Sequence, residues 1–142
     1  MGVIPAGFAK LDATSPFHDL VGPLYVRSSA AETSVGLLVA DKHQNRRGVV
    51  HGGMICTLTD FALGYTASIA TGTPRKLVTT SLACDFAGNA RPGDWIEARV
   101  EVYRPGNRVA FASCFVWRID AGGASERIAR ASATFQILRP EE

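Results

Sequence analysis

Hydrophobic and polar residues alternate with a period of two along most of the second half of the chain. In residues 94–104, for example, Ile96, Ala98, Val100 and Val102 alternate with larger or charged side chains. This alternation is typical of a strand with one buried face. We therefore predict four consecutive antiparallel strands joined by short turns, at residues 77–87, 94–104, 108–119 and 127–138.

Residues 51–69 have a different pattern, because apolar side chains recur on nearly every side of the segment. The turn sequence Gly72-Thr73-Pro74 follows it. We predict a long helix that ends before this turn and is covered nearly all round by other elements. Its threonines and Asp60 make the segment too polar for a membrane span, which needs about 20 mainly apolar residues.

The first forty residues predict a short helix followed by a hairpin. Ser15 and Pro16 are a typical N-cap and first helical residue, and Gly22 is a typical end. Two strand-like runs follow at residues 23–29 and 33–40, and a polar loop occupies residues 41–48.

This element order predicts an α+β fold. A curved antiparallel sheet of about six strands wrapped around one long central helix would satisfy both patterns. Residues 1–142 would form a single domain, with residues 1–22 as an N-terminal extension. Such a domain leaves the far side of the helix and one sheet edge uncovered, and a second copy of the chain would cover both. We therefore predict a homodimer or a higher assembly.

Composition excludes several functional classes. With 46% hydrophobic residues, 20% charged residues and a net charge of +2, the chain has a core-forming composition. Its basic residues form no block, so nucleic acid is not an expected partner. The N-terminal sequence has neither a secretion signal nor a lipidation signal, which favours the cytoplasm.

Cysteines and histidines are too dispersed for a disulfide framework or a metal site. The three cysteines are widely separated in apolar contexts, as expected of reduced core thiols. The histidines lack metal-ligand spacing with one another or with the cysteines. These residues are Cys56, Cys84, Cys114, His18, His43 and His51.

The entry to the predicted long helix has the composition of a catalytic site. Gly52 and Gly53 lie where the helix begins, so their N–H groups are first-turn donors without intrahelical partners. Such donors stabilise a carbonyl oxygen that gains negative charge, and glycine lets a substrate approach closely. The alternative is a plain glycine turn. Asp60 follows between apolar residues, where a carboxylate is disfavoured unless it is paired or functional, although it could also lie on the helix surface.

Gly52 and Asp60 are too far apart on one helix to act together. Eight residues of helix separate them by roughly 12 Å along the axis. If two helices run antiparallel across a two-fold axis, Gly52 of one chain can meet Asp60 of the other. The spacing therefore predicts two equivalent sites per dimer, each shared by both subunits.

The string NRRGVVHGGMICTLTDFALG, residues 45–64, resembles the hotdog-fold acyl-CoA thioesterases of the phenylacetate-degradation type. The resemblance implies the hotdog fold, hydrolysis of acyl-CoA thioesters, shared sites, and dimers that pair into tetramers. It implies that Asp60 is the general base or the nucleophile, with the sequence unable to choose between these roles.

Other site residues follow from the same resemblance. Asn45 would position the substrate or the attacking water, and His51 would hold the loop or the thioester oxygen. Gly53 and Thr79 would contact the substrate, Thr79 at a position where some members carry a serine near the acid. Their alternatives are a turn asparagine, a backbone-bonding histidine and an ordinary strand threonine.

Coenzyme A would enter as part of the substrate, with no separate cofactor. Its phosphates favour arginine or lysine at the rim of a pocket. Arg91, Arg104 and Arg108 lie at predicted strand ends and are candidates. Many relatives place the basic residue directly after the glycine of the turn, whereas here Asn107 intervenes. A general preference for arginine over lysine in the chain is the alternative explanation.

Two other functions fit the same fold. Hotdog hydratases or dehydratases act on enoyl or hydroxyacyl thioesters, but they use a differently placed His/acid pair. A non-catalytic acyl-CoA-binding module would bind the ligand without turnover.

Overall fold

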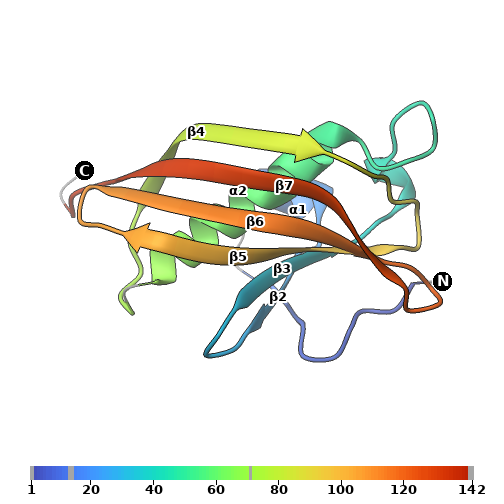
Figure 1. The fold of residues 1–142 in the computed structure, drawn as a ribbon, viewed down its shortest axis with the longest axis horizontal. Coiled ribbons are helices and arrows are strands. Elements are labelled where there is room, and N and C mark those ends of the chain that lie inside the picture. The colour runs from blue at the N-terminus through green and yellow to red at the C-terminus, as the bar shows by residue number, and fades with distance from the viewer. Residues whose placement is uncertain (1, 13–14, 71, 141–142) are drawn as a thin grey trace.

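The computed structural model describes residues 2–12, 15–70 and 72–140, without the side chains of residues 103–105. A seven-stranded antiparallel sheet curves around one long helix, α2 (Figure 1). This confirms the predicted hotdog architecture. The elements are β1 (Ala9–Lys10), α1 (Pro16–Val21), β2 (Tyr25–Ser28), β3 (Thr33–Leu38), the 3₁₀ turn η1 (Asp41–His43), α2 (Gly52–Ile69), β4 (Leu77–Phe86), β5 (Trp95–Pro105), β6 (Val109–Ile119) and β7 (Ser125–Ile137).

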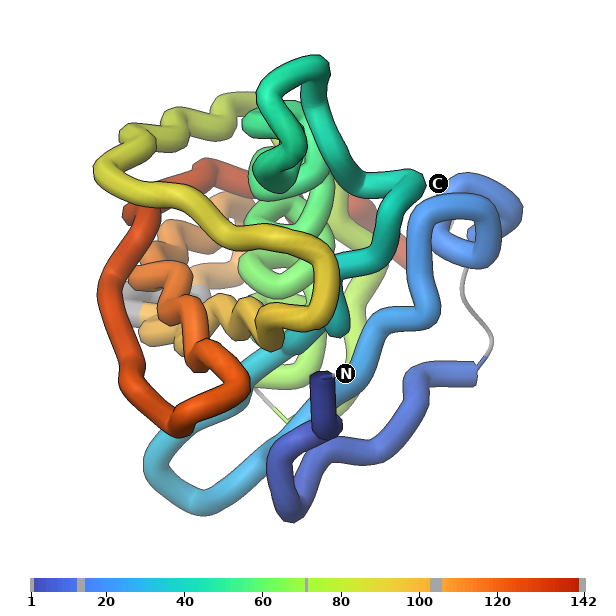
Figure 2. Tube along the Cα trace, turned by 90° about the vertical axis from the view of Figure 1, so that its right-hand side faces the viewer, coloured from blue at the N-terminus to red at the C-terminus, as the bar shows by residue number. Residues whose placement is uncertain are grey.

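The strand order corrects one sequence prediction. The sheet order is β1-β2-β3-β5-β6-β7-β4, so β4 pairs with β7 and not with the next strand in sequence, β5. The prediction of consecutive pairing is correct for β5, β6 and β7 and wrong for β4. Residues 87–94 cross the entry of α2 instead of forming a hairpin: the Val50 N–H donates to the Ala90 oxygen at 2.8 Å and the Gly93 N–H to the Val39 oxygen at 2.8 Å. In Figure 2 this segment passes over the end of the helix.

The inner face of the sheet is rich in alanine, which lets α2 lie close to it. Central positions of β5, β6 and β7 are buried alanines, and the helix buries Leu58, Ala62 and Leu63 completely against them. Small side chains on the sheet thus face larger ones on the helix, a combination that allows close packing. The buried alanines of these strands are Ala98, Ala110, Ala112, Ala129, Ala131 and Ala133.

The predicted short helix and hairpin are confirmed, and the structure adds a two-residue strand, β1, that pairs with β2 and was not predicted. Ser15 caps α1 by accepting a hydrogen bond from the His18 N–H, Pro16 begins the helix and Gly22 is its C-cap. β2 and β3 form the predicted antiparallel hairpin. Among the described helices, none has the length and apolar character needed to cross a membrane.

Glu97 of β5 is a buried carboxylate on the outer face of the sheet. Only 1% of its surface is exposed. It accepts hydrogen bonds from Trp95 Nε1 at 2.9 Å, Arg99 Nε at 2.9 Å and Arg27 Nη2 at 3.3 Å. A buried carboxylate is tolerated when charged donors compensate its lost hydration. This cluster joins β2 to β5 across β3.

Substituting Glu97→Gln should destabilise the fold by about 2 kcal/mol, because hydrogen bonds from charged donors to a carboxylate exceed those to a neutral amide. Urea denaturation with an unchanged m-value would measure the difference. Glu126→Gln is the matched control: Glu126 pairs with Arg118 Nη2 at 3.2 Å with 52% of its side chain exposed, so a loss below about 0.5 kcal/mol is expected. Equal losses for both variants would contradict the role of the buried cluster.

Candidate active site

His51 caps the N-terminus of α2. Its Nδ1 accepts a hydrogen bond from the Gly53 N–H at 2.8 Å. A Cβ atom at position 53 would lie 2.9 Å from this Nδ1, closer than such atoms approach. A side chain at position 53 would therefore displace the imidazole from its capping position. The structure shows the backbone-bonding arrangement for His51, and a contact with substrate remains a prediction.

The Gly52 N–H is left as a donor at the same helix end. Within the described residues, no hydrogen bond occupies it, and Gly52 is half-buried. The ring of Phe86, at the end of β4, lies 3.5 Å from the position that a Cβ on Gly52 would take. First-turn N–H groups with the helix dipole behind them attract an oxygen that carries negative charge. Gly52 thus offers one suitable donor for a polarised carbonyl.

Asn45 organises the loop before α2. Its Oδ1 accepts from the Arg47 N–H at 2.8 Å and from the Val49 N–H at 3.4 Å, an Asx-type turn. Gly48 completes this turn with a φ of +77°. The carboxamide oxygen is therefore occupied by the loop, and the side-chain NH₂ is the part of Asn45 that could contact a substrate or water.

A second histidine, His43, holds the loop before α2 in place through hydrogen bonds. His43 is 3% exposed, and its Nδ1 accepts from the Ala40 N–H at 2.9 Å. The His51 N–H donates to the His43 carbonyl oxygen at 2.7 Å, which ties the cap to the 3₁₀ turn. Burial lowers the pKa of His43, so the neutral imidazole is the form that holds the loop.

Asp60 and Thr79 meet between α2 and β4. Thr79 Oγ1 donates to Asp60 Oδ1 at 2.7 Å. The β4–β7 register shifts between Thr79 and Ser81, so Thr80 lies in a bulge directly beside this contact. Bulges change the direction of a neighbouring side chain. The bond occupies one oxygen of the half-buried carboxylate, and the other is available for a reactant.

Aromatic side chains surround this pair in a cavity of about 240 Å³. Phe61 and Tyr65 stack with ring centroids 5.8 Å apart, and His18 of α1 meets Phe61 edge-on at 4.6 Å. Phe135 of β7 also lines the cavity. The sequence assigned none of these residues to the site. The cap at Ser15 predicts α1, but nothing in the local sequence shows that α1 packs beside Asp60.

The structure places Gly52 and Asp60 on the same straight run of helix, at the first and ninth residues of α2. About 12 Å of helix axis therefore separates the free N–H from the acid. A carbonyl group cannot contact both within one chain.

The three candidate arginines do not lie together. Arg91 is exposed in the segment that crosses the entry of α2, where its N–H donates to Asp94 Oδ2 at 2.8 Å. Arg108 is exposed in the β5–β6 turn, and its carbonyl oxygen accepts from the Ile137 N–H at 2.8 Å. Arg104 lies in β5, and its side chain is outside the described part of the structure. Arg91 precedes β5 and Arg108 follows it, so the two lie beyond opposite ends of this strand.

Cysteine and metal chemistry find little support in the described residues. All three cysteines are free thiols. Burial raises the pKa of Cys84 to about 11 and that of Cys114 to about 12, so both stay protonated at neutral pH. Among the described side chains, His, Cys, Asp and Glu nowhere gather in a group of three that could hold a metal ion.

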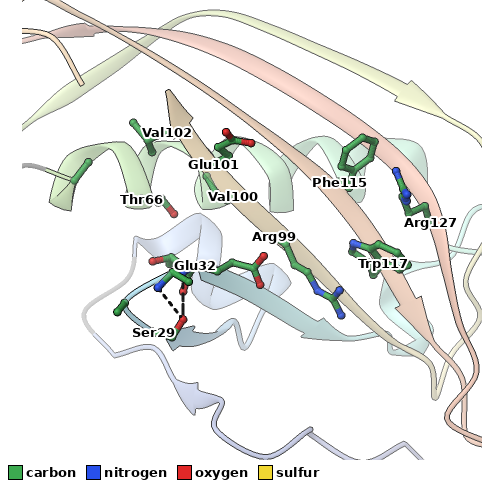
Figure 3. Close-up of a pocket in the computed structure, with 14 residues that line it drawn as sticks. Ser29, Glu32, Thr66, Arg99, Val100, Glu101, Val102, Phe115, Trp117 and Arg127 are labelled. Atoms are coloured by element: carbon green, nitrogen blue, oxygen red, sulfur yellow. Dashed lines mark hydrogen bonds between the residues drawn. The ribbon is translucent and has the colours of Figure 1, made fainter. Parts of the chain in front are cut away.

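Another cavity, of about 730 Å³, lies beside the β2–β3 turn and β5. Figure 3 shows Arg127 next to the rings of Trp117 and Phe115, and its guanidinium carbon lies 5.2 Å and 4.6 Å from their centroids. Arg99 lies over the other side of Trp117 at 4.7 Å. None of the predicted site residues lines this cavity. These stacked side chains stabilise the outer face of the sheet.

Comparison with known proteins identifies a family. The family model described as the thioesterase superfamily matches residues 47–124. A protein of Pseudomonas aeruginosa named as a candidate esterase is 39% identical over 135 residues, which cover 94% of this chain and 97% of the relative.

Solved structures show the same fold. A conserved protein of Pseudomonas aeruginosa has a TM-score of 0.75 and 27% identity, over 88% of this chain and 95% of that chain. A variant of the phenylacetic acid degradation protein PaaI of Thermus thermophilus has a TM-score of 0.71 and 26% identity, over 87% and 100% of the two chains.

Proposed function

Because the chain belongs to the thioesterase superfamily, we propose that it hydrolyses acyl-CoA thioesters to the free acid and coenzyme A. Thioester hydrolysis in general follows from the family, and the acyl-CoA substrate is our proposal. The observation that carries it is Asp60, which accepts a 2.7 Å hydrogen bond from Thr79 of β4 and lies on the same helix as the free Gly52 N–H. The reaction needs a general base or a nucleophile and an oxyanion donor, and Asp60 and the Gly52 N–H are suited to these roles.

The proposed site combines residues of two subunits. The acyl carbonyl oxygen would accept from the Gly52 N–H of one subunit, and Asp60 of the other would lie beside the carbonyl carbon. Two α2 helices that run antiparallel across a two-fold axis bring these groups together twice. The unpaired outer edge of β4, most of whose residues are exposed, gives such a partner a surface to cover.

Hydrolysis at this site follows one of two routes. As general base, Asp60 takes a proton from water while the water oxygen bonds to the carbonyl carbon. As nucleophile, its carboxylate oxygen bonds to that carbon, and water then cleaves the resulting anhydride. In both routes negative charge moves to the carbonyl oxygen beside Gly52, the carbon–sulfur bond breaks, and the sulfur leaves as the thiol after it gains a proton.

Thr79 and the aromatic residues have supporting roles in this proposal. The Thr79 hydroxyl holds one Asp60 oxygen, which fixes the direction of the other. The rings of Phe61, Tyr65 and Phe135 exclude bulk water from one side of the carboxylate. Electrostatic interactions are stronger where water is excluded.

A substrate panel tests the proposal. Purified protein should release thiol from at least one of a set of short, medium and aromatic acyl-CoAs, with an equal amount of free acid. Enoyl absorbance would be followed in the same assays. Saturable binding without turnover would indicate a binding module, and loss of enoyl absorbance without thiol release would indicate a hydratase.

A further inference from the structure

The leaving sulfur of the proposed reaction needs a proton donor. In the nucleophilic route, Asp60 is bonded to the acyl carbon when the carbon–sulfur bond breaks, so its carboxylate carries no proton at that moment. In the general-base route, the Asp60 oxygen that holds a proton faces the water from which it took that proton. A second titratable group beside Asp60 would supply the proton to the sulfur in either route.

His18 of α1 lines the same cavity as Asp60. Helix α1 lies beside α2 (Figure 1), and the His18 ring meets edge-on the ring of Phe61, the residue after Asp60, with centroids 4.6 Å apart. Among the described residues of the lining, Asp60 is the only carboxylate and His18 the only imidazole. One subunit thus places an acid and a base in one cavity.

One nitrogen of the His18 ring is held, and the other is free. Nδ1 lies 2.9 Å from Ser15 Oγ, and the same oxygen accepts from the His18 N–H at 3.2 Å. No hydrogen bond to another described residue occupies Nε2. A serine oxygen has two lone pairs, so it can accept from both of these His18 groups together. Nδ1 then keeps its proton while Nε2 gains or loses one.

Contacts at the end of α1 fix the position of His18. Lys42 Nζ donates to the Leu20 carbonyl oxygen at 3.1 Å, and His43 Nε2 bonds to the Val21 carbonyl oxygen. The 3₁₀ turn η1 that supports the loop before α2 therefore also holds α1. His18 is placed beside α2 by the same contacts that order the helix entry.

We propose that His18 is a catalytic residue that gives a proton from Nε2 to the leaving sulfur. This inference rests on the proposed hydrolysis of acyl-CoA. The sulfur is bonded to the carbon that Asp60 faces, which places it at the cavity that His18 lines. The N–H bond of the imidazolium breaks, an S–H bond forms, and the electron pair of the carbon–sulfur bond goes to the sulfur.

Water restores the proton on His18. In the nucleophilic route, the neutral imidazole takes a proton from the water that cleaves the anhydride, and Asp60 is released as a carboxylate. In the general-base route, Asp60 passes to His18 the proton that it took from water. Both routes end with the imidazolium and the carboxylate, and the net reaction converts thioester and water into acid and thiol.

Other polar groups of the cavity are less suited to this transfer. The Thr79 hydroxyl already donates to Asp60, and the Ser68 hydroxyl donates to the Arg75 carbonyl oxygen at 2.7 Å. The guanidinium of an arginine does not lose its proton in proteins. The Tyr65 hydroxyl is the competing donor, but imidazole is the side chain that changes its charge near neutral pH.

The test compares two thioesters of one acyl group, an acyl-CoA and a 4-nitrothiophenyl thioester. The alkyl thiolate of coenzyme A leaves more readily when it is protonated, whereas the aryl thiolate is stable as the anion and leaves without a proton. His18→Gln should lower kcat/KM for the acyl-CoA by about 10². It should leave kcat/KM for the aryl thioester unchanged, because a glutamine amide can replace Nε2 in a hydrogen bond but cannot transfer a proton.

His18→Asn and Leu20→Ala complete the comparison. The asparagine amide can keep the contact with Ser15 Oγ, so this variant should show the same dependence on the leaving group as His18→Gln. Leu20→Ala is the matched control, since Leu20 lies on α1, is 72% exposed and does not line the Asp60 cavity. It should leave both kcat/KM values unchanged.

Three outcomes would overturn the role of His18. These are wild-type values for both thioesters in His18→Gln, an equal loss for both thioesters in both His18 variants, and a loss specific to acyl-CoA in Tyr65→Phe but in neither His18 variant. If the wild-type protein hydrolyses neither thioester, the proposed function fails and this inference fails with it. If the wild-type protein hydrolyses acyl-CoA and one of the three outcomes is found, only the inference fails.

Discussion

Asp60→Asn should lower kcat for acyl-CoA hydrolysis by about 10² to 10⁴, the usual contribution of a general base or a nucleophile. The amide oxygen of asparagine can still accept the hydrogen bond from Thr79 Oγ1, which is 2.7 Å long in the wild-type protein. The aromatic wall of the cavity should also remain. The variant therefore removes the reactive carboxylate and little else, so KM should change much less than kcat. Steady-state thiol release at saturating substrate measures the effect.

Asp85→Asn is the matched control for this variant. Asp85 lies on β4, as Thr79 does, but 71% of its side chain is exposed and its partner is Arg130 on the outer face of the sheet. The same chemical change there should leave kcat unchanged. If both variants keep the wild-type rate, Asp60 is neither the general base nor the nucleophile of the reaction.

The sequence predicted the elements of the fold well because their patterns are local. The period-two strands and the apolar helix at residues 51–69 follow from side-chain burial on one or on all faces. The pairing of β4 with β7 could not be predicted in the same way. It depends on the course of residues 87–94 over the helix entry, where hydrogen bonds connect segments distant in sequence, such as Val50 with Ala90.

Only the part of the candidate site that lies within one local motif could be predicted from the sequence. Gly52, His51 and Asn45 are close in sequence, so their common location at the helix entry follows from the motif alone. The Thr79–Asp60 contact joins a strand to the helix, and only the resemblance to relatives pointed to it. The position of His18 beside the Asp60 cavity depends on tertiary packing between distant segments, which no local pattern shows.

Different properties explain the presence of glycine at positions 52 and 53. A side chain at Gly53 would collide with the capping ring of His51, at 2.9 Å, so this glycine is explained by local packing. Gly52 has more room, because the nearest atoms to a Cβ there are those of Phe86 at 3.5 Å. Its free N–H, and not its packing, is the property that bears on function. The sequence predicted that the N–H groups of both glycines lack partners, and this is wrong for Gly53, whose N–H donates to His51 Nδ1 at 2.8 Å.

The sharing of the site between subunits is the central claim, and mixed dimers test it. Gly52→Val should inactivate the donor half, since its side chain would crowd Phe86 and block the approach to the N–H. Asp60→Asn inactivates the half of the site that contributes the carboxylate. In a mixed dimer, one site would then carry both wild-type residues and the other site both substitutions.

The decisive measurement is thiol release from an equimolar mixture of the two inactive variants after they are unfolded together and refolded. Random pairing makes about half of the dimers mixed, each with one intact site of two, so we expect about one quarter of the wild-type turnover. Each variant refolded alone should show almost none. A mixture as inactive as its components, although mixed dimers form, would mean that Gly52 of one chain and Asp60 of the other do not form one site, which contradicts the shared arrangement.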